Sequence, residues 1–129
     1  MMIHTSPIAL ITGANKGIGH AIARQLGQAG HTVWLGCRDI SRAEIAVRAL
    51  RDDGIDARVV QLDVTDSDSV ANAVKTIESE IGRLDVLINN AALMFGSPFS
   101  PAEETIGEMQ QMFDTNVLGV MRVTQAFLP

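Results

Sequence analysis

Short continuous apolar segments alternate with apolar stripes at helical spacing along this chain. The first segment, residues 8–12, has the unbroken apolar character of a strand buried on both faces of a parallel sheet. Four such segments predict strands, at residues 8–12, 32–36, 58–62 and 85–88. The stripes between them predict helices, each closed by a glycine suited to a left-handed cap: Gly30, Gly54 and Gly82.

A last helix is predicted to open at Ser100 and to run on to Leu128. Pro101 suits its first position, and Glu103 completes a capping-box spacing with Ser100. Strands that alternate with helices at this interval need crossover connections, which produce a parallel sheet with helices on both faces. The sequence therefore predicts a doubly wound α/β fold, with residues 1–129 as one domain that stops after about four strands.

Composition narrows the class of protein. The chain has 129 residues, of which 47% are hydrophobic and 19% charged, and no apolar run approaches the roughly 18 residues of a membrane span. Its net charge of -5 argues against binding to nucleic acid or anionic lipid. The first residues lack the basic and apolar regions of a secretory signal, so we expect a cytoplasmic protein.

The histidines and the single cysteine do not predict a metal site. Cys37 has no second cysteine with which to form a disulfide or a multi-cysteine site. His4, His20 and His31 show no ligand spacing with one another or with Cys37. We expect these histidines at the terminus, on a helix surface and in a loop.

A glycine-rich loop joins the first predicted strand to its helix. Residues 12–19 read Thr-Gly-Ala-Asn-Lys-Gly-Ile-Gly, which places glycines where the chain turns sharply and where backbone N–H groups and a helix N-terminus approach a pyrophosphate. The third, Gly19, is expected to let the helix pack close to the strand. A tight turn without ligand is the alternative, but the strand-to-helix context favours a Rossmann-type dinucleotide site.

The loop resembles the Thr-Gly-x-x-x-Gly-x-Gly signature of the short-chain dehydrogenase/reductase family. Asp63-Val64 looks like the pair that borders the adenine ring in that family. Residues 89–92 resemble its Asn-Asn-Ala-Gly turn, with Ala92 in place of the glycine. Asn116, within residues 115–119, is similar to the family's catalytic asparagine. The resemblance runs from Ile8 to Pro129.

The resemblance implies a cofactor site and one catalytic position, Asn116. The alternative for Asn116 is a structural role, in which its hydrogen bonds stabilise a kink in the helix. Thr12 would tie the glycine loop to the turn at 89–90, and Asp63 could also cap a helix. The implied cofactor-binding residues are Gly13, Asn15, Lys16, Gly17, Ile18, Gly19, Arg38, Asp63, Val64, Asn90, Ala91 and Ala92.

The end of the second predicted strand bears on the choice of cofactor. An acidic residue there would accept hydrogen bonds from the ribose of NAD, but the position falls on Cys37. Arg38 follows, and Lys16 lies in the loop, so two cations could converge on the 2′-phosphate of NADP. We predict NADP; NAD is the alternative, because Asp39 would serve as the acid if the strand ended later.

The family's Tyr-x-x-x-Lys pair has no place in this chain, which contains no tyrosine. We therefore expect a fragment of a longer NADP-dependent oxidoreductase that moves hydride between nicotinamide and a small carbonyl or alcohol substrate, with this part inactive alone. A silent dinucleotide-binding or interaction module is the alternative. By resemblance the last helix, which carries Met109, Met112 and Met121, would pack against the core or a partner in a homo-oligomer.

Overall fold

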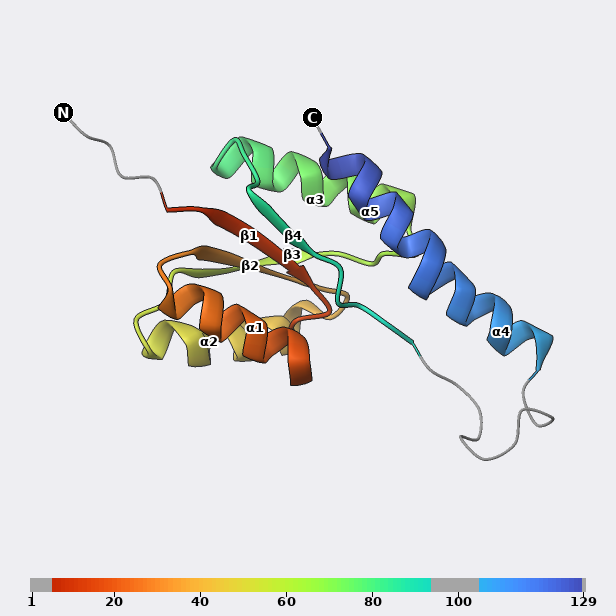
Figure 1. The fold of residues 1–129 in the computed structure, drawn as a ribbon, viewed down its shortest axis with the longest axis horizontal. Helices are drawn as coiled ribbons and strands as arrows, with labels where there is room; N and C mark the ends of the chain where they lie inside the picture. Colours follow the sequence, from red (N-terminus) through yellow and green to blue (C-terminus); the bar gives the residue numbers. More distant parts are fainter. Residues whose placement is uncertain (1–5, 94–104, 129) are drawn as a thin grey trace.

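The computed structural model describes residues 6–93 and 105–128, and in this part of the chain four parallel strands form one sheet in the order β3-β2-β1-β4 (Figure 1). The strands are β1 (Ile8–Thr12), β2 (Thr32–Cys37), β3 (Ala57–Gln61) and β4 (Val86–Ile88). In the register Ala9 is paired with Val33 on one side and Val86 on the other. The four predicted strands are confirmed, with ends that shift by one residue.

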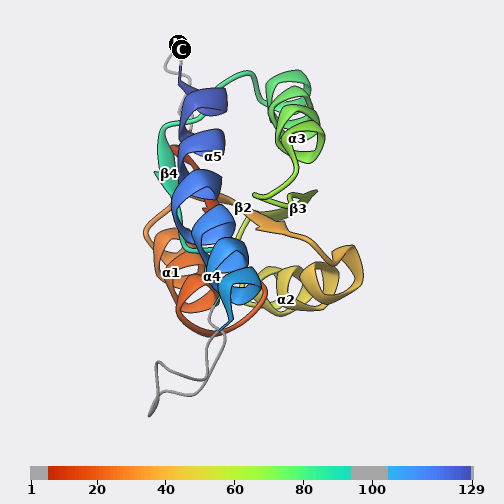
Figure 2. The same ribbon diagram turned by 90° about the vertical axis from the view of Figure 1, so that its right-hand side faces the viewer.

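The helices cover both faces of this sheet. They are α1 (Gly17–Gln28), α2 (Ile40–Asp52), α3 (Ser67–Glu80), α4 (Ile106–Phe113) and α5 (Gly119–Phe127), with a π-helical segment, η2 (Asp114–Leu118), between the last two. Helices α1 and α2 lie on one face, and α3 and α5 lie on the other (Figures 1 and 2). This arrangement confirms the doubly wound α/β fold.

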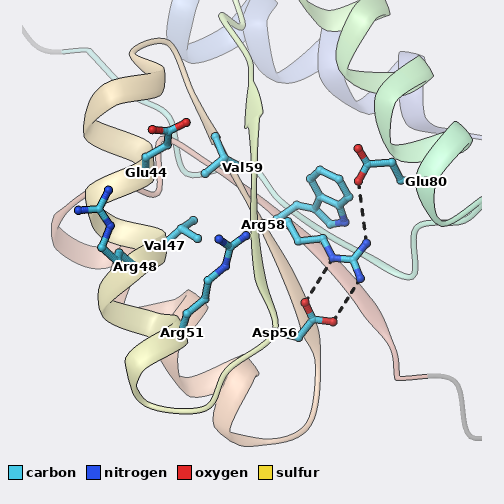
Figure 3. Close-up of a pocket in the computed structure, with 9 residues that line it drawn as sticks. Glu44, Val47, Arg48, Arg51, Asp56, Arg58, Val59 and Glu80 are labelled. Atoms are coloured by element: carbon cyan, nitrogen blue, oxygen red, sulfur yellow. Dashed lines mark hydrogen bonds and ion pairs between the residues drawn. The ribbon is translucent and has the colours of Figure 1, made fainter.

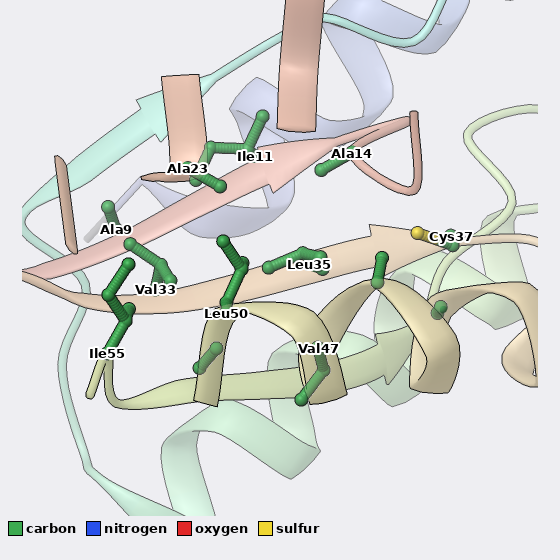
Figure 4. Packing of buried hydrophobic residues seen from close by; sticks show 13 residues of the cluster. Ala9, Ile11, Ala14, Ala23, Val33, Leu35, Cys37, Val47, Leu50 and Ile55 are labelled. Atoms are coloured by element: carbon green, nitrogen blue, oxygen red, sulfur yellow. The ribbon is translucent and has the colours of Figure 1, made fainter. Parts of the chain in front are cut away.

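Two apolar layers fill the spaces between sheet and helices. Successive strand residues point to opposite faces, so adjacent residues of β1 belong to different layers. Ile11, with Leu35 of β2 and Leu50 of α2, packs beneath α1 and α2 (Figure 4). Leu10 packs with Val123 on the face covered by α3 and α5. Both faces of the central strands are thus buried, which explains their unbroken apolar sequences.

The predicted helix ends are found where glycine was expected to cap them. Gly30, Gly54 and Gly82 have φ values of +99°, +80° and +85°, in the left-handed region that favours glycine.

The last helix differs from its prediction. It begins at Ile106, because Thr105 has extended backbone and forms a capping box with Glu108, in which the Thr105 side chain accepts the Glu108 N–H. The predicted start at Ser100 lies outside the described residues.

The two edges of the sheet are unlike each other. At the β3 edge, Arg51 Nε donates to the Ala57 carbonyl at 2.8 Å, and Arg58 pairs with Asp56 and Glu80 (Figure 3). Charged groups at a strand edge discourage pairing with another chain. At the opposite edge, β4 pairs only with β1 among the described residues, and its three apolar residues are half-buried.

Candidate functional site

A hollow of about 480 Å³ opens at the carboxyl ends of the strands. In open α/β sheets this edge is where ligands bind. The hollow is lined by Gly13, Asn15, Lys16, Gly17, Ile18, Cys37, Arg38, Leu62, Asp63, Val64, Thr65, Asn90, Ala91, Ala92, Leu93 and Thr115. The fold therefore brings all the predicted cofactor residues except Gly19 to one place. Gly19 does not line the hollow but lies beside Asn90, which does.

Five lining residues were not among the predicted cofactor residues: Cys37, Leu62, Thr65, Leu93 and Thr115. Each is within two positions of a predicted residue, so proximity to the motifs was the available signal.

The glycine loop needs its first two glycines for different reasons. Gly13 and Gly17 both have φ of +62°. A Cβ on Gly13 would lie 2.9 Å from the Cα of Ala91, whereas a Cβ on Gly17 would meet nothing within 4 Å. Packing and backbone conformation thus fix Gly13, while Gly17 is fixed by conformation alone and leaves open space above the start of α1.

Gly19, on α1, leaves space for the side chain of Asn90, which lies in the turn after β4. A Cβ there would lie 2.4 Å from Asn90 Nδ2, the atom that donates to the Gly13 carbonyl at 3.1 Å. A Cβ would also lie 3.0 Å from the Gly13 carbonyl oxygen, directly after β1, so a side chain at Gly19 is excluded both by Asn90 and by the expected close approach to the end of the strand.

Thr12 joins the glycine loop to the turn that follows β4. Its Oγ1 accepts the N–H groups of Asn90 at 3.0 Å and Ala91 at 2.9 Å, and it donates to the Ile88 carbonyl at 3.5 Å. The side chain is 1% exposed. The predicted tie is confirmed, and one hydroxyl holds two backbone donors that line the hollow.

The end of β2 places a cation, and not an acid, directly after the strand. β2 ends at Cys37, and the exposed Arg38 follows. Asp39 Oδ1 accepts the N–H groups of Ser41 at 2.9 Å and Arg42 at 3.3 Å and so caps α2. The carboxylate that favoured NAD in the sequence therefore has a structural role at the start of a helix.

Lys16 is the second cation at the hollow. It is exposed at the N-terminal end of α1, and no ion pair of Lys16 or Arg38 occurs within the described part of the chain. Both charges are therefore available to an anion.

Cys37 forms part of the wall below the glycine loop. Burial raises the pKa of its thiol, and the backbone N–H groups of Ala14 and Asn15 oppose that shift. The side chain is 3% exposed. At neutral pH it is an uncharged, compact group that brings no negative charge close to the loop.

Asp63 folds the segment after β3 and does not cap a helix. Its Oδ1 accepts the Thr65 N–H at 2.9 Å and the Thr65 hydroxyl at 2.6 Å. The cap of α3 is Asp66, whose side chain accepts the N–H of Ser69 at 3.3 Å. The capping alternative for Asp63 is thus wrong.

Asn116 lies in η2 and grips the segment that follows β4. Its Oδ1 accepts the Leu93 N–H and its Nδ2 donates to the Leu93 carbonyl, each at 2.8 Å. Asn116 does not line the hollow, but Leu93 and Thr115 do. A π-helical turn inside an α-helix frequently marks a functional position, and here it presents Asn116 to the wall of the hollow.

A second hollow, of about 540 Å³, lies at the β3 edge (Figure 3). It is lined largely by charged side chains, several of which pair with one another, and it is remote from the glycine loop. We therefore place the candidate functional site at the smaller hollow, which is lined by the glycine loop and by the exposed cations Lys16 and Arg38.

Two features are absent from the described ranges, a metal-ligand cluster and a helix suited to span a membrane. No group of three His, Cys, Asp or Glu residues there could hold a metal ion. None of the helices in residues 6–93 and 105–128 has the length and apolar character needed to cross a membrane. Among the histidines in these ranges, His31 Nδ1 lies 3.1 Å from the Leu26 carbonyl oxygen, and His20 Nε2 is buried without a hydrogen-bond partner.

The chain spans about half the length of the curated relatives that it matches. Carbonyl reductase (NADPH) 1 of Sus scrofa is 40% identical over 134 residues, which cover 99% of this chain and 44% of the relative. A 3-oxoacyl-(acyl-carrier-protein) reductase of Staphylococcus aureus is 36% identical over 124 residues, which cover 94% of this chain and 49% of the relative.

Solved structures of similar proteins have the same fold as this chain. A variant of actinorhodin polyketide ketoreductase, crystallised with NADPH, superposes with a TM-score of 0.89 at 34% identity, over 95% of this chain and 46% of that one. The family model described as short chain dehydrogenase matches residues 7–129. The chain belongs to the short-chain dehydrogenase family.

Proposed function

We propose that this chain is the dinucleotide-binding part of an NADP-linked oxidoreductase that acts on a small carbonyl or alcohol substrate. The proposal rests on one observation: a loop with two glycines in the left-handed region and two exposed cations, Lys16 and Arg38, line the same hollow. The bound cofactor would supply the hydride chemistry, and the chain would supply binding and orientation.

The shape of the site fits a dinucleotide. The open space above Gly17 admits a pyrophosphate against the start of α1, where free N–H groups and the helix dipole favour negative charge. Asp63 and Val64 line the hollow together with Asn90 and Ala91. We propose that the first pair borders the adenine end of the dinucleotide and the second pair its nicotinamide end.

The preference for NADP rests on the end of β2. Arg38 offers a planar fork of donors to a 2′-phosphate, and Lys16 adds a point charge. Cys37 is uncharged and Asp39 is engaged in capping α2, so neither competes for the phosphate. NADPH also appears in the names of the carbonyl reductase and the ketoreductase structure. NAD is the alternative that the test below distinguishes.

Asn116 remains a proposed catalytic position, and its two hydrogen bonds to Leu93 suggest that it contributes by positioning this segment. It orients the wall beside the reacting end of the cofactor. The chain has no tyrosine, so a tyrosine general acid of the whole protein would lie outside it, and we expect this chain alone to bind without turnover.

A titration tests the proposal. The whole protein is titrated with NADPH and NADH by cofactor fluorescence, alongside Arg38→Gln and a matched control, Arg48→Gln, which removes an exposed arginine of α2. We expect tighter binding of NADPH, a loss of about tenfold for NADPH in Arg38→Gln, and no change for NADH or in the control. Equal affinities for both dinucleotides would refute the NADP preference, and binding without turnover of any carbonyl compound would favour the silent module.

We also propose that the protein is cytoplasmic and forms a homo-oligomer. The last helices support the second part, because they expose Ile106 at 79%, Met109 at 50%, Phe113 at 54% and Met121 at 50%. Ile106, Met109 and Phe113 recur every three or four positions along α4 and so lie on a common stripe, and Met121 is exposed on α5. Light scattering should give a multiple of the protomer mass, and Phe113→Glu should reduce it; a monomeric wild type would refute this part.

A further inference from the structure

Arg122 connects two segments that border the proposed dinucleotide site, one after β3 and the other at η2. It lies on α5 with a side chain only 27% exposed. Its NH1 group donates to the Val64 carbonyl at 3.0 Å and to the Asp114 carbonyl at 3.4 Å, and its NH2 group pairs with the Asp114 carboxylate. One guanidinium therefore joins the segment after β3 to the start of η2.

The bonds of Arg122 fall on the residue that begins the π-helical turn. The Asp114 carbonyl also accepts the N–H of Gly119, five residues later, which is the hydrogen bond that makes the turn π-helical. Gly119 is buried, and a Cβ there would lie 2.8 Å from Val64 Cγ2. The helix and the segment after β3 thus approach closely at this point, and Arg122 secures both.

The same turn also contacts the lining of the hollow. Asn116, two residues after Asp114, forms two hydrogen bonds with Leu93, and Leu93 lines the hollow, as Val64 does. We infer that Arg122, which does not itself line the hollow, is a positioning residue: it holds η2 in place and so sets where Leu93 stands relative to Val64. Its consequence for dinucleotide affinity rests on the proposed function.

The chemistry of the contact requires arginine. The planar fork donates to two acceptors from separate segments at once, whereas a lysine ammonium is a single point charge with strong hydration. Lysine would keep the pairing with Asp114 and lose the hold on the Val64 carbonyl. We therefore expect Arg122→Lys to recover only part of what Arg122→Met loses.

Two measurements on the whole protein test the inference. The first is hydrogen exchange of the Leu93 amide, which reports on the grip of Asn116 without any cofactor. The second is the dissociation constant for NADPH. The control is Val47→Ala, which truncates a buried residue of α2 on the opposite face of the sheet and so lowers stability without contact to η2.

We expect Arg122→Met to speed exchange at Leu93 at least tenfold and to weaken NADPH binding about tenfold, or about 1.4 kcal/mol. Arg122→Lys should fall between it and the wild type, and Val47→Ala should lower the melting temperature with neither effect. Unchanged exchange at Leu93 in Arg122→Met would overturn the inference, as would an equal change in Val47→Ala. A wild type that binds neither dinucleotide would refute the proposed function alone, since the exchange result stands without cofactor.

Discussion

Replacing Thr12 with valine should destabilise the protein through two backbone groups that lose their acceptor. Valine keeps the shape of threonine and removes the hydroxyl that accepts the N–H groups of Asn90 and Ala91 at 3.0 Å and 2.9 Å. A donor left unsatisfied in the interior costs about 1–3 kcal/mol. Because both residues are half-buried, we take the lower part of that range for each and expect about 2–4 kcal/mol in total.

The matched variant is Thr12→Ser, which keeps the hydroxyl and removes a methyl group from a site that is 1% exposed. Loss of one buried methyl costs about 1 kcal/mol. Denaturant unfolding of the two variants should therefore differ by about 1–3 kcal/mol in favour of serine, a large part of the roughly 5–15 kcal/mol that typically holds a domain together.

The refuting result concerns the order of the two variants. If Thr12→Val is as stable as Thr12→Ser, the hydroxyl does not hold the turn after β4. Hydrogen exchange at the amides of Asn90 and Ala91 gives an independent reading, because these two sites should lose protection in the valine variant and keep it in the serine variant.

Three further predictions follow from contacts at the site and at the base of the sheet. Gly19→Ala would place a Cβ 2.4 Å from Asn90 Nδ2, so we expect a loss of about 1–3 kcal/mol in unfolding experiments and weaker NADPH binding; wild-type values for both would contradict the geometry. The Ile8 N–H donates to the Asp85 carboxylate and holds its pKa below the usual value. The carboxylate therefore stabilises the fold at pH values above its unfolded pKa, and this contribution is lost as the pH falls through the folded pKa. Asp85→Asn should flatten the acid limb of a plot of stability against pH, and an unchanged limb would refute the assignment. Burial raises the pKa of Cys37, so iodoacetamide should label this thiol slowly in the native protein near pH 8 and rapidly in denaturant, and rapid native labelling would contradict the buried position.

The fold was accessible from the sequence because its local signals agree with its packing. The unbroken apolar run of Ile8–Thr12 is typical of a strand that is covered on both faces, and in the structure all five residues are buried in such a strand. Gly30 and the other two terminating glycines stand at backbone positions that other residues avoid. Each signal is local, and the topology follows from their order.

Details that depend on distant contacts escaped the sequence. Gly19 accommodates Asn90, a neighbour 71 positions away in the chain, and no local pattern reveals such a contact. The capping box at Thr105 and Glu108 was not predicted, although it has the same spacing as the one expected at Ser100, because spacing alone does not show where a helix begins. The π-helical turn at Asp114 likewise depends on Arg122 and on the close approach of Gly119 to Val64, which are features of tertiary packing.

The two edges of the sheet differ in how they would receive a further strand. Arg51 occupies an outward carbonyl of β3, so a strand arriving on that side would have to displace a guanidinium before it could pair. The Val86–Ile88 edge carries no such guard among the described residues. An added strand would therefore meet a bound guanidinium beside β3 and none beside β4 in the described part of the chain, so the two edges differ in how strongly they resist pairing.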